Sequence, residues 1–245
     1  MKKPPAALRL QERIDAGRAA LAAGRLPEAA VHWAAALRSA QRLRVDETLR
    51  ATLRNNLASV YHSLGETSKA RKYYQQALEA AAARHGNESV QAATIATNLA
   101  ELLRASGEAP EAERLYRAAI AVVNKAVGGS HPQLGTLLNN LAECLRTLNR
   151  PEEAEPHYRH ALAIFEASLG PNHPQVAAVL NNLAALEADR GSFAAAEALY
   201  ARALTILGPL QPHAAPVMIN YAVVLRKHAA ALEAQAKSFP PQRTA

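Results

Sequence analysis

The stretch Leu137-Leu138-Asn139-Asn140-Leu141-Ala142-Glu143-Cys144-Leu145 has shortened copies along most of the chain, at an almost fixed interval. Counted at the second asparagine, the copies fall at positions 56, 98, 140, 182 and 220. The spacing is 42 residues three times and then 38. A tyrosine keeps step with the motif, at Tyr74, Tyr116, Tyr158 and Tyr200. Two markers that stay in phase over four repeats predict a repeat protein rather than one or two globular domains.

Each repeat is expected to contain two helices. In the helix that contains the motif, apolar side chains recur at intervals of 4, 3, 4 and 3, which places them on one helix face: Leu134, Leu138, Leu141, Leu145 and Leu148. Gly65, Gly107, Asn149 and Gly191 fall where the chain must turn into the second helix. The fold class is therefore predicted to be all-α, with antiparallel helix pairs.

Helix ends are marked by short polar segments. Asp46 is expected to cap one first helix, and the loop His85-Gly86-Asn87 precedes the next. Gly128-Gly129-Ser130-His131-Pro132 and Gly170-Pro171-Asn172-His173-Pro174 each predict a helix-ending glycine, an N-cap at Ser130 or Asn172, and a proline in the first turn. His131 and His173 are best explained by capping.

The repeat pattern predicts the domain organisation. Residues 1–5 are expected to be a disordered lead-in and residues 238–245 a disordered tail, with a solenoid over 6–237. A degenerate repeat without the asparagine motif occupies 6–45. Full repeats follow at 46–87, 88–129, 130–171 and 172–212, and a terminal capping helix at 213–237, beginning near His213.

Composition narrows the function classes. The chain has no run of 18 apolar residues, so we expect no membrane span and a cytoplasmic protein. The start Met1-Lys2-Lys3 imitates a secretory signal, but polar residues from Arg9 onwards interrupt any hydrophobic region. The single cysteine, Cys144, is expected to be a small buried thiol.

Positive charge is concentrated at the beginning of the chain. The formal net charge is +7, and residues 1–54 hold 11 Lys and Arg against 5 Asp and Glu, a surplus of 11 − 5 = +6. This distribution favours an acidic partner or surface at the first repeat. A solubilising helix face explains it equally well.

The repeated Asn-Asn-Leu-Ala, Gly, Glu-Ala, Tyr and Ala-Leu positions resemble the tetratricopeptide repeat (TPR), and the 42-residue period resembles the kinesin-light-chain type. The segments Pro151–Leu162 and Leu169–Pro174 are especially similar to that type. The resemblance covers roughly residues 6–237 and implies a right-handed superhelical solenoid whose first helices line a concave groove. It also implies a protein-protein interaction scaffold or adaptor. Asn149, Glu187 and Ile219 depart from the pattern.

A polar stripe on the first helices is the candidate site. Placed at 100° intervals, Asn139, Glu143 and Arg146 fall opposite the leucine stripe. A primary amide offers an acceptor and two donors, which match the backbone of an extended peptide. The predicted peptide-binding residues are Asn55, Asn56, Thr97, Asn98, Arg104, Asn139, Asn140, Arg146, Asn181, Asn182, Asn220 and Arg226.

Each part of this interpretation has an alternative. The arginines favour an acidic protein or peptide ligand, but Glu101 and Glu143 stand three residues before two of them and would neutralise them within the helix. The second asparagine of each pair is as well suited to joining neighbouring helices. The tyrosine column is expected to pack in the core.

Other function classes have weaker support. Nucleic-acid binding through the basic N-terminal region is the main alternative, but aromatic residues do not alternate with the basic ones there. His157 and His160 would need Glu153 or Glu155 as companions to hold a metal. No phosphate loop, nucleophile elbow or catalytic carboxylate pair stands out, so we expect no enzyme and no cofactor. Self-association through the first repeat is a further alternative.

Overall fold

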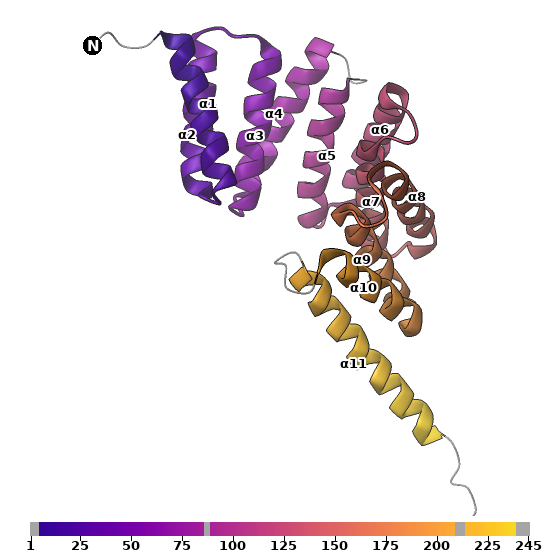
Figure 1. Cartoon of the computed structure of the whole chain (residues 1–245). Helices are drawn as coiled ribbons and strands as arrows, with labels where there is room; N and C mark the ends of the chain where they lie inside the picture. Colours follow the sequence, from indigo (N-terminus) through magenta and orange to yellow (C-terminus); the bar gives the residue numbers. More distant parts are fainter. Residues whose placement is uncertain (1–4, 86–88, 209–213, 239–245) are drawn as a thin grey trace, which may run out of the picture. The chain divides into compact units, whose positions relative to one another are not determined.

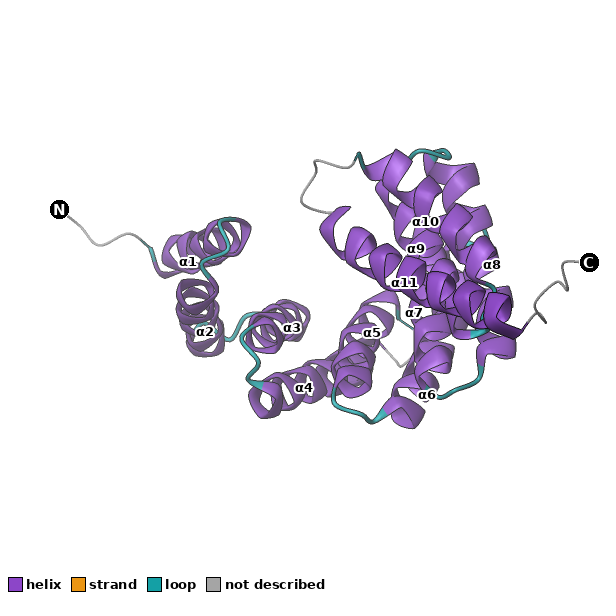
Figure 2. Ribbon diagram, turned by 90° about the horizontal axis from the view of Figure 1, so that it is seen from below, coloured by secondary structure: helices purple, strands orange, loops and turns teal. Residues whose placement is uncertain are grey.

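The computed structural model describes residues 5–85, 89–208 and 214–238. Within these ranges it contains eleven α-helices and no β-strand (Figures 1 and 2). Most of the predicted lead-in and tail lies outside the described residues, as do Asn87 and His213. The predicted all-α fold, an array of helical hairpins, is confirmed.

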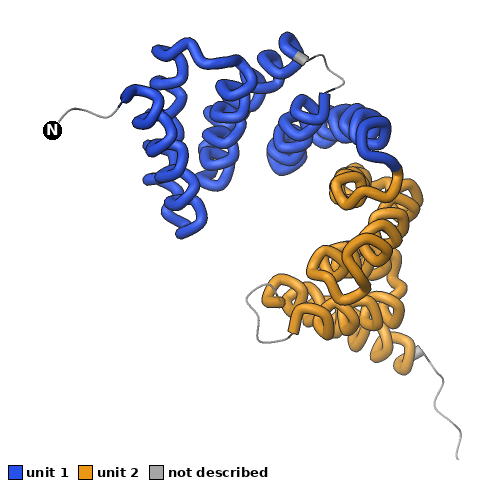
Figure 3. The backbone as a smooth tube through the Cα atoms, turned by 45° about the horizontal axis from the view of Figure 1, so that its top comes forward, with its two compact units in different colours: residues 1–128 blue, residues 129–245 orange. Residues whose placement is uncertain are grey.

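The chain divides into two compact units, residues 1–128 and 129–245 (Figure 3). Unit 1 contains α1 (Ala6–Ala22), α2 (Leu26–Arg42), α3 (Glu47–Ser63), α4 (Thr67–His85), α5 (Val90–Ala105) and α6 (Ala109–Val127). Unit 2 contains α7 (Pro132–Thr147), α8 (Pro151–Leu169), α9 (Pro174–Asp189), α10 (Phe193–Leu207) and α11 (Ala215–Ser238).

Consecutive helices form the hairpins that the repeat predicts. The most extensive packing is between α1 and α2, α3 and α4, α5 and α6, α7 and α8, and α9 and α10. Each hairpin then packs on the next helix of its unit, as α2 does on α3 and α8 on α9. The apolar residue after each asparagine pair is buried, at Leu57, Leu99, Leu141 and Leu183. The motif residues therefore build the core.

The tyrosine column and the cysteine also lie in the core. Tyr74, Tyr116, Tyr158 and Tyr200 are each at most 2% exposed, which confirms that they are packing residues. Cys144 is buried as well.

The turns within hairpins need a left-handed backbone. Gly65, Gly107 and Gly191 have positive φ, and Asn149 takes the same place with φ of 57°. Asparagine is one of the few residues with a side chain that tolerates this conformation. The replacement of glycine by Asn149 therefore preserves the turn.

One set of predicted N-caps is wrong. Asp46 caps α3 as expected, accepting a hydrogen bond from the Thr48 amide at 3.3 Å. However, the caps of α7 and α9 are His131 and His173, whose Nδ1 atoms accept from Gln133 N and Gln175 N, both at 3.2 Å. Ser130 and Asn172 lie one residue too early, because Pro132 and Pro174 are the first helical residues.

The last helix is packed along one side only. Val217 and Val224 of α11 are buried, and Tyr221 stacks on Tyr200 with ring centroids 5.6 Å apart. Met218 and Leu225 are 46% and 43% exposed. Residues 229–237 are all exposed. The increasingly polar capping helix expected here thus also presents large apolar side chains.

Candidate peptide-binding face

The predicted polar residues lie on the first helix of each full hairpin and, for Asn220 and Arg226, on α11. The asparagines form hydrogen bonds to one another between these helices. In unit 1, Asn98 Nδ2 on α5 donates to Asn55 Oδ1 on α3 at 3.0 Å. The donor is the second asparagine of one repeat and the acceptor is the first asparagine of the repeat before it. The asparagine columns therefore join neighbouring first helices.

Unit 2 extends this arrangement into a chain of five amides, which we call the amide chain: Asn140, Asn139, Asn182, Asn181 and Asn220. Asn182 Nδ2 donates to Asn139 Oδ1 at 3.0 Å, and Asn220 Nδ2 to Asn181 Oδ1 at 3.1 Å. Within each pair, Asn139 donates to Asn140 at 3.4 Å and Asn181 to Asn182 at 3.1 Å. Two of these four hydrogen bonds cross between helices, one from α9 to α7 and one from α11 to α9.

The asparagines of the amide chain have further hydrogen-bond donors and acceptors that these four bonds do not use. A primary amide has two N–H donors and an oxygen with two lone pairs. The bond between Asn182 and Asn139 uses one donor of the first and one lone pair of the second. Asn139, Asn181 and Asn182 are only partly buried, and Asn220 is exposed. The same residues can therefore join helices and present further polar groups to a ligand.

The arginines of the stripe are paired within the chain. Arg104 donates to both oxygens of Glu101, with its Nη2 atom 2.6 Å from Oε1. Arg146 donates to Glu143 and, through Nη1, to Asp189 of α9 at 2.9 Å. Both arginines are therefore neutralised by a glutamate of their own helix, which is the alternative that the sequence left open.

Each of these glutamates also accepts from a core tyrosine. Tyr116 Oη donates to Glu101 Oε2 at 3.0 Å, and Tyr158 Oη to Glu143 Oε2 at 2.8 Å. Burial alone would raise the pKa of Glu101, but the bond and charge of Arg104, with the Tyr116 hydroxyl, lower it overall. Burial raises the pKa of Tyr158, and the Glu143 carboxylate raises it further. The polar stripe is therefore tied to the core beneath it.

Two clefts lie on this face in unit 2. The larger, of about 430 Å³, is lined by residues of α9, by Leu207 and by the start of α11. The smaller, of about 130 Å³, lies between α7, α8 and α9. Both are lined by Gln175 and the exposed Ala178 of α9. Asn181 and Asn182 border the first cleft, and Asn139 borders the second. The amide chain and the clefts therefore form one surface, the first-helix face of unit 2.

The other predicted residues are placed differently. Thr97 Oγ1 donates to Ala93 O of its own helix at 2.7 Å. Asn56 is partly buried on α3, and Arg226 is exposed on α11. Sequence reasoning missed Gln175 and Thr136, which also line the clefts. A signal existed for the glutamine, because Gln91, Gln133 and Gln175 recur at the same 42-residue interval.

Metal and membrane sites find no support in the part of the chain that the structure describes. There, no three His, Cys, Asp or Glu side chains are grouped so as to hold a metal ion, and this includes the surroundings of His157 and His160. In the same ranges, each helix is too short or too polar to cross a bilayer.

Comparisons with known proteins agree with this architecture. The crystal structure of BtubC (BKLC) from P. vanneervenii is similar with a TM-score of 0.65 and 22% identity, over 99% of this chain and 97% of that one. A kinesin light chain of Podosopora anserina with nearly identical TPR-like repeats gives 0.68 and 21%, over 86% of this chain and 100% of that one.

A Rap protein complexed with competence and sporulation factor gives a TM-score of 0.71 and 19% identity, over 83% of this chain but 55% of that one. These identities show a shared fold alone. No curated protein sequence matches the chain.

The family itself is established by sequence. A model of the tetratricopeptide repeat matches residues 6–83, 91–167 and 150–208, which together make up well over half of the chain. The matched ranges together cover the helices α1 to α10 almost completely. The chain belongs to the tetratricopeptide repeat family.

Proposed function

We propose that the protein is a non-enzymatic interaction scaffold that binds an extended segment of a partner protein on the first-helix face of unit 2. Tetratricopeptide repeat families are generally non-catalytic scaffolds, which supports this class of function. The observation that carries the assignment to this face is the pair of clefts that share Gln175 and Ala178 beside the amide chain.

The mechanism is recognition of the peptide backbone. Amide groups supply donors and acceptors at intervals along the face, and the mainly apolar walls of the larger cleft receive side chains. The helices that carry these groups are held together by the amide chain itself. A surface already ordered before binding saves the entropic cost of ordering the receptor.

The preference for an acidic ligand remains a weaker part of the proposal. Arg104 and Arg146 already have carboxylate partners, so a ligand would have to compete with Glu101, Glu143 and Asp189. The exposed Arg226 on α11 is the better candidate for contact with an acidic residue. We therefore expect backbone and apolar contacts to supply most of the affinity at this face.

The experiment is a quantitative pull-down from a lysate of the source organism with three proteins: wild type, Ala178→Trp and Ala201→Trp. The indole at position 178 fills the meeting point of the two clefts without removing a hydrogen bond. Ala201 is an exposed alanine on α10 and provides the matched control. Circular dichroism establishes that all three proteins are folded.

We expect a partner that the wild type and Ala201→Trp retain and that Ala178→Trp loses by about tenfold or more, because a bulky group in a cleft excludes the ligand. A partner retained equally by all three proteins would place the binding surface elsewhere. Retention of none by the wild type would count against the scaffold function itself.

A further inference from the structure

The first full hairpin differs from the later ones at two core positions. Two residues before the second asparagine, α3 has Arg54, whereas the later first helices have Ala96, Leu138 and Leu180. Six residues before it, α3 has Arg50, whereas the others have Ala92, Leu134 and Val176. All six of those apolar residues are buried, at 7% exposure or less. Two guanidinium groups thus stand where the repeat otherwise places core side chains.

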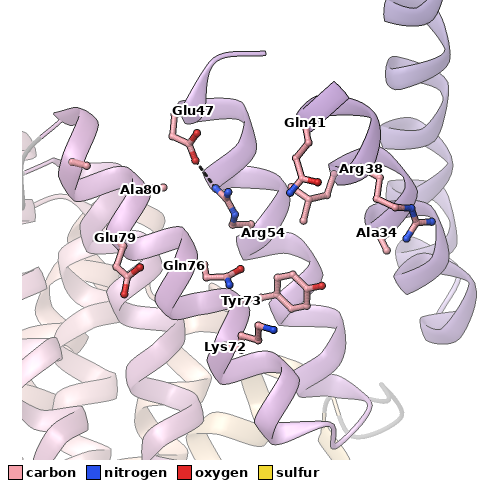
Figure 4. Close-up of a pocket in the computed structure, with 12 residues that line it drawn as sticks. Ala34, Arg38, Gln41, Glu47, Arg54, Lys72, Tyr73, Gln76, Glu79 and Ala80 are labelled. Atoms are coloured by element: carbon pink, nitrogen blue, oxygen red, sulfur yellow. Dashed lines mark hydrogen bonds and ion pairs between the residues drawn. The ribbon is translucent and has the colours of Figure 1, made fainter. Parts of the chain in front are cut away.

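A cleft of about 680 Å³ is lined by Arg54, one of these two arginines (Figure 4). Its walls are α2 and α4, and α3 forms its floor. Arg38 and Gln41 come from α2, Arg54 from α3, and Lys72 and Gln76 from α4. This volume falls in the range of about 300–1,000 Å³ that is usual for ligand sites.

The described lining of the cleft has three cationic side chains, Arg38, Arg54 and Lys72, against two carboxylates, Glu47 and Glu79. Glu47 is the shared partner of Arg54 and Arg50: its Oε1 atom lies 2.5 Å from Arg54 Nη1, and its Oε2 atom contacts Arg50. The Arg54 side chain is only 15% exposed. Among the described residues, the buried Arg50 Nε has no hydrogen-bond partner. Arg54 and Arg50 are partly buried and share one carboxylate, and Glu79 is the other carboxylate of the described lining. Partly desolvated guanidinium groups interact more strongly with a carboxylate than groups in bulk water do, so the excess positive charge favours an acidic ligand.

The positive charge continues across α2. A smaller cleft, of about 160 Å³, is lined by Arg9, Arg13 and Arg42. Arg42 lies one helical turn after Arg38 of the larger cleft. When Gly24 is aligned with Gly65, Arg9 and Arg13 correspond to Arg50 and Arg54, so both early hairpins carry the same pair of arginines. Of the 11 Lys and Arg residues in 1–54, five line one of these two clefts: Arg9, Arg13, Arg38, Arg42 and Arg54.

We propose that the cleft between α2 and α4 binds an acidic segment of a partner protein, with Asp or Glu carboxylates against Arg54, Arg38 and Lys72. Guanidinium groups pair with carboxylates through two parallel hydrogen bonds, and Gln41 and Gln76 add neutral donors at the walls. Tyr73 is the one aromatic residue in the described lining. Single-stranded nucleic acid would favour several aromatic side chains for stacking.

The variant Arg54→Leu is designed to remove a binding residue of the cleft without destabilising the fold. Leucine is the residue at this position in α7 and α9, where it is buried. Glu47 keeps Arg50 as a partner after the change, so no carboxylate is orphaned. The Glu47 side chain is also 27% exposed, so water can solvate the carboxylate oxygen that Arg54 leaves. The matched control is Arg114→Leu, which removes the same charge from a side chain that is 77% exposed on α6.

The experiment measures the fluorescence anisotropy of labelled hexaglutamate with the full-length proteins. Hexaglutamine and oligothymidylate are the comparison probes. We expect the wild type to bind hexaglutamate, and Arg54→Leu to weaken this binding about tenfold or more, as for loss of a charged hydrogen bond. The unfolding temperature of Arg54→Leu should equal or exceed that of the wild type. Arg114→Leu should change the affinity less than about twofold, since a surface charge contributes little.

Three outcomes would overturn the proposal. They are no binding of hexaglutamate by the wild type, equal weakening by the two substitutions, and tighter binding of oligothymidylate that depends on Arg54. If Arg54→Leu fails to fold, Arg38→Gln/Lys72→Gln makes the same test with residues of the walls. Because neither set of variants alters α9, failure here is distinct from failure of the Ala178→Trp experiment.

Discussion

At the scale of single residues, the sequence predicts which side chains share a face but not which partners they take. The helical spacing of 100° per residue placed Asn139, Glu143 and Arg146 on one stripe. Their bonds to Asn182, Tyr158 and Asp189 depend on rotamers and on the distance between neighbouring helices, and a periodicity contains neither. The two asparagine columns could therefore be assigned to a ligand or to a neighbouring helix with similar weight.

The sequence also does not show why two glycines stand inside helices, because the reason is an aromatic side chain of the neighbouring helix. A Cβ atom built on Gly135 of α7 would lie 2.9 Å from Phe165 Cε1 of α8, and one on Gly17 would lie 2.9 Å from Trp33 Cε2. Both contacts are closer than packed atoms tolerate. In these two hairpins, the missing side chain of glycine lets an aromatic ring lie against the helix backbone.

Gly135→Ala should therefore destabilise the fold. Alanine gains about 1 kcal/mol over glycine in helix propensity, but overpacking costs about 1–3 kcal/mol. We expect a net loss of about 1 kcal/mol in chemical denaturation. The double variant Gly135→Ala/Phe165→Leu should lose less than the sum of the two single changes, because leucine vacates the space. Strict additivity would contradict this account.

At the scale of elements, the sequence predicted which segments are helical, but it predicted the first residues of some helices less accurately. The helical stripe and the turn residues were sufficient for ten helices arranged as hairpins. For α7 and α9 the N-caps predicted at Ser130 and Asn172 lie one residue too early, whereas the capping role predicted for His131 and His173 is confirmed. The fixed φ of proline at the first helical position is the stronger constraint here.

Helix α11 is the element whose stability should vary most along its length. Its first half packs on α10 through Val217 and Val224, whereas residues 229–237 are exposed on every side. An unsupported helical segment of this length is marginal in water. Amide hydrogen exchange in residues 230–237 should therefore be at least about tenfold faster than in residues 218–227.

Mass-spectrometric hydrogen exchange at neutral pH makes this comparison, with the packed helix α9 as the internal reference. Equal protection along the whole of α11 would contradict the prediction and would mean that its exposed side is covered in solution.

At the scale of the whole molecule, the fold was predictable because one period governs most of the chain. The basic cleft was not predicted, although the charge surplus of residues 1–54 was evident. Arg50 and Arg54 depart from the apolar pattern at core positions, and aligning the repeats at those positions would have revealed them. What the sequence could not provide is the space between α2 and α4 that makes them a site.

The buried tyrosine column makes a prediction for both units together. Burial raises the pKa of Tyr74 to about 12, and raises the pKa of Tyr158 and Tyr200 as well. An unfolded tyrosine ionises near pH ~10. A folded pKa above the unfolded value means that the stabilisation is complete below pH ~10 and is lost as pH rises towards the folded value. The fold should therefore unfold in alkali, driven by phenol ionisation.

Parallel titrations of phenolate absorbance and helical circular dichroism test this from about pH 8 to pH 13. The buried tyrosines should ionise together with the loss of helix, rather than before it. Tyr74→Phe removes one of the shifted phenols, so the fall in unfolding free energy per pH unit above pH ~10 should become less steep. Full ionisation of all seven tyrosines while the helical signal stays intact would contradict the prediction, because it would show that the column is accessible to hydroxide in the folded state.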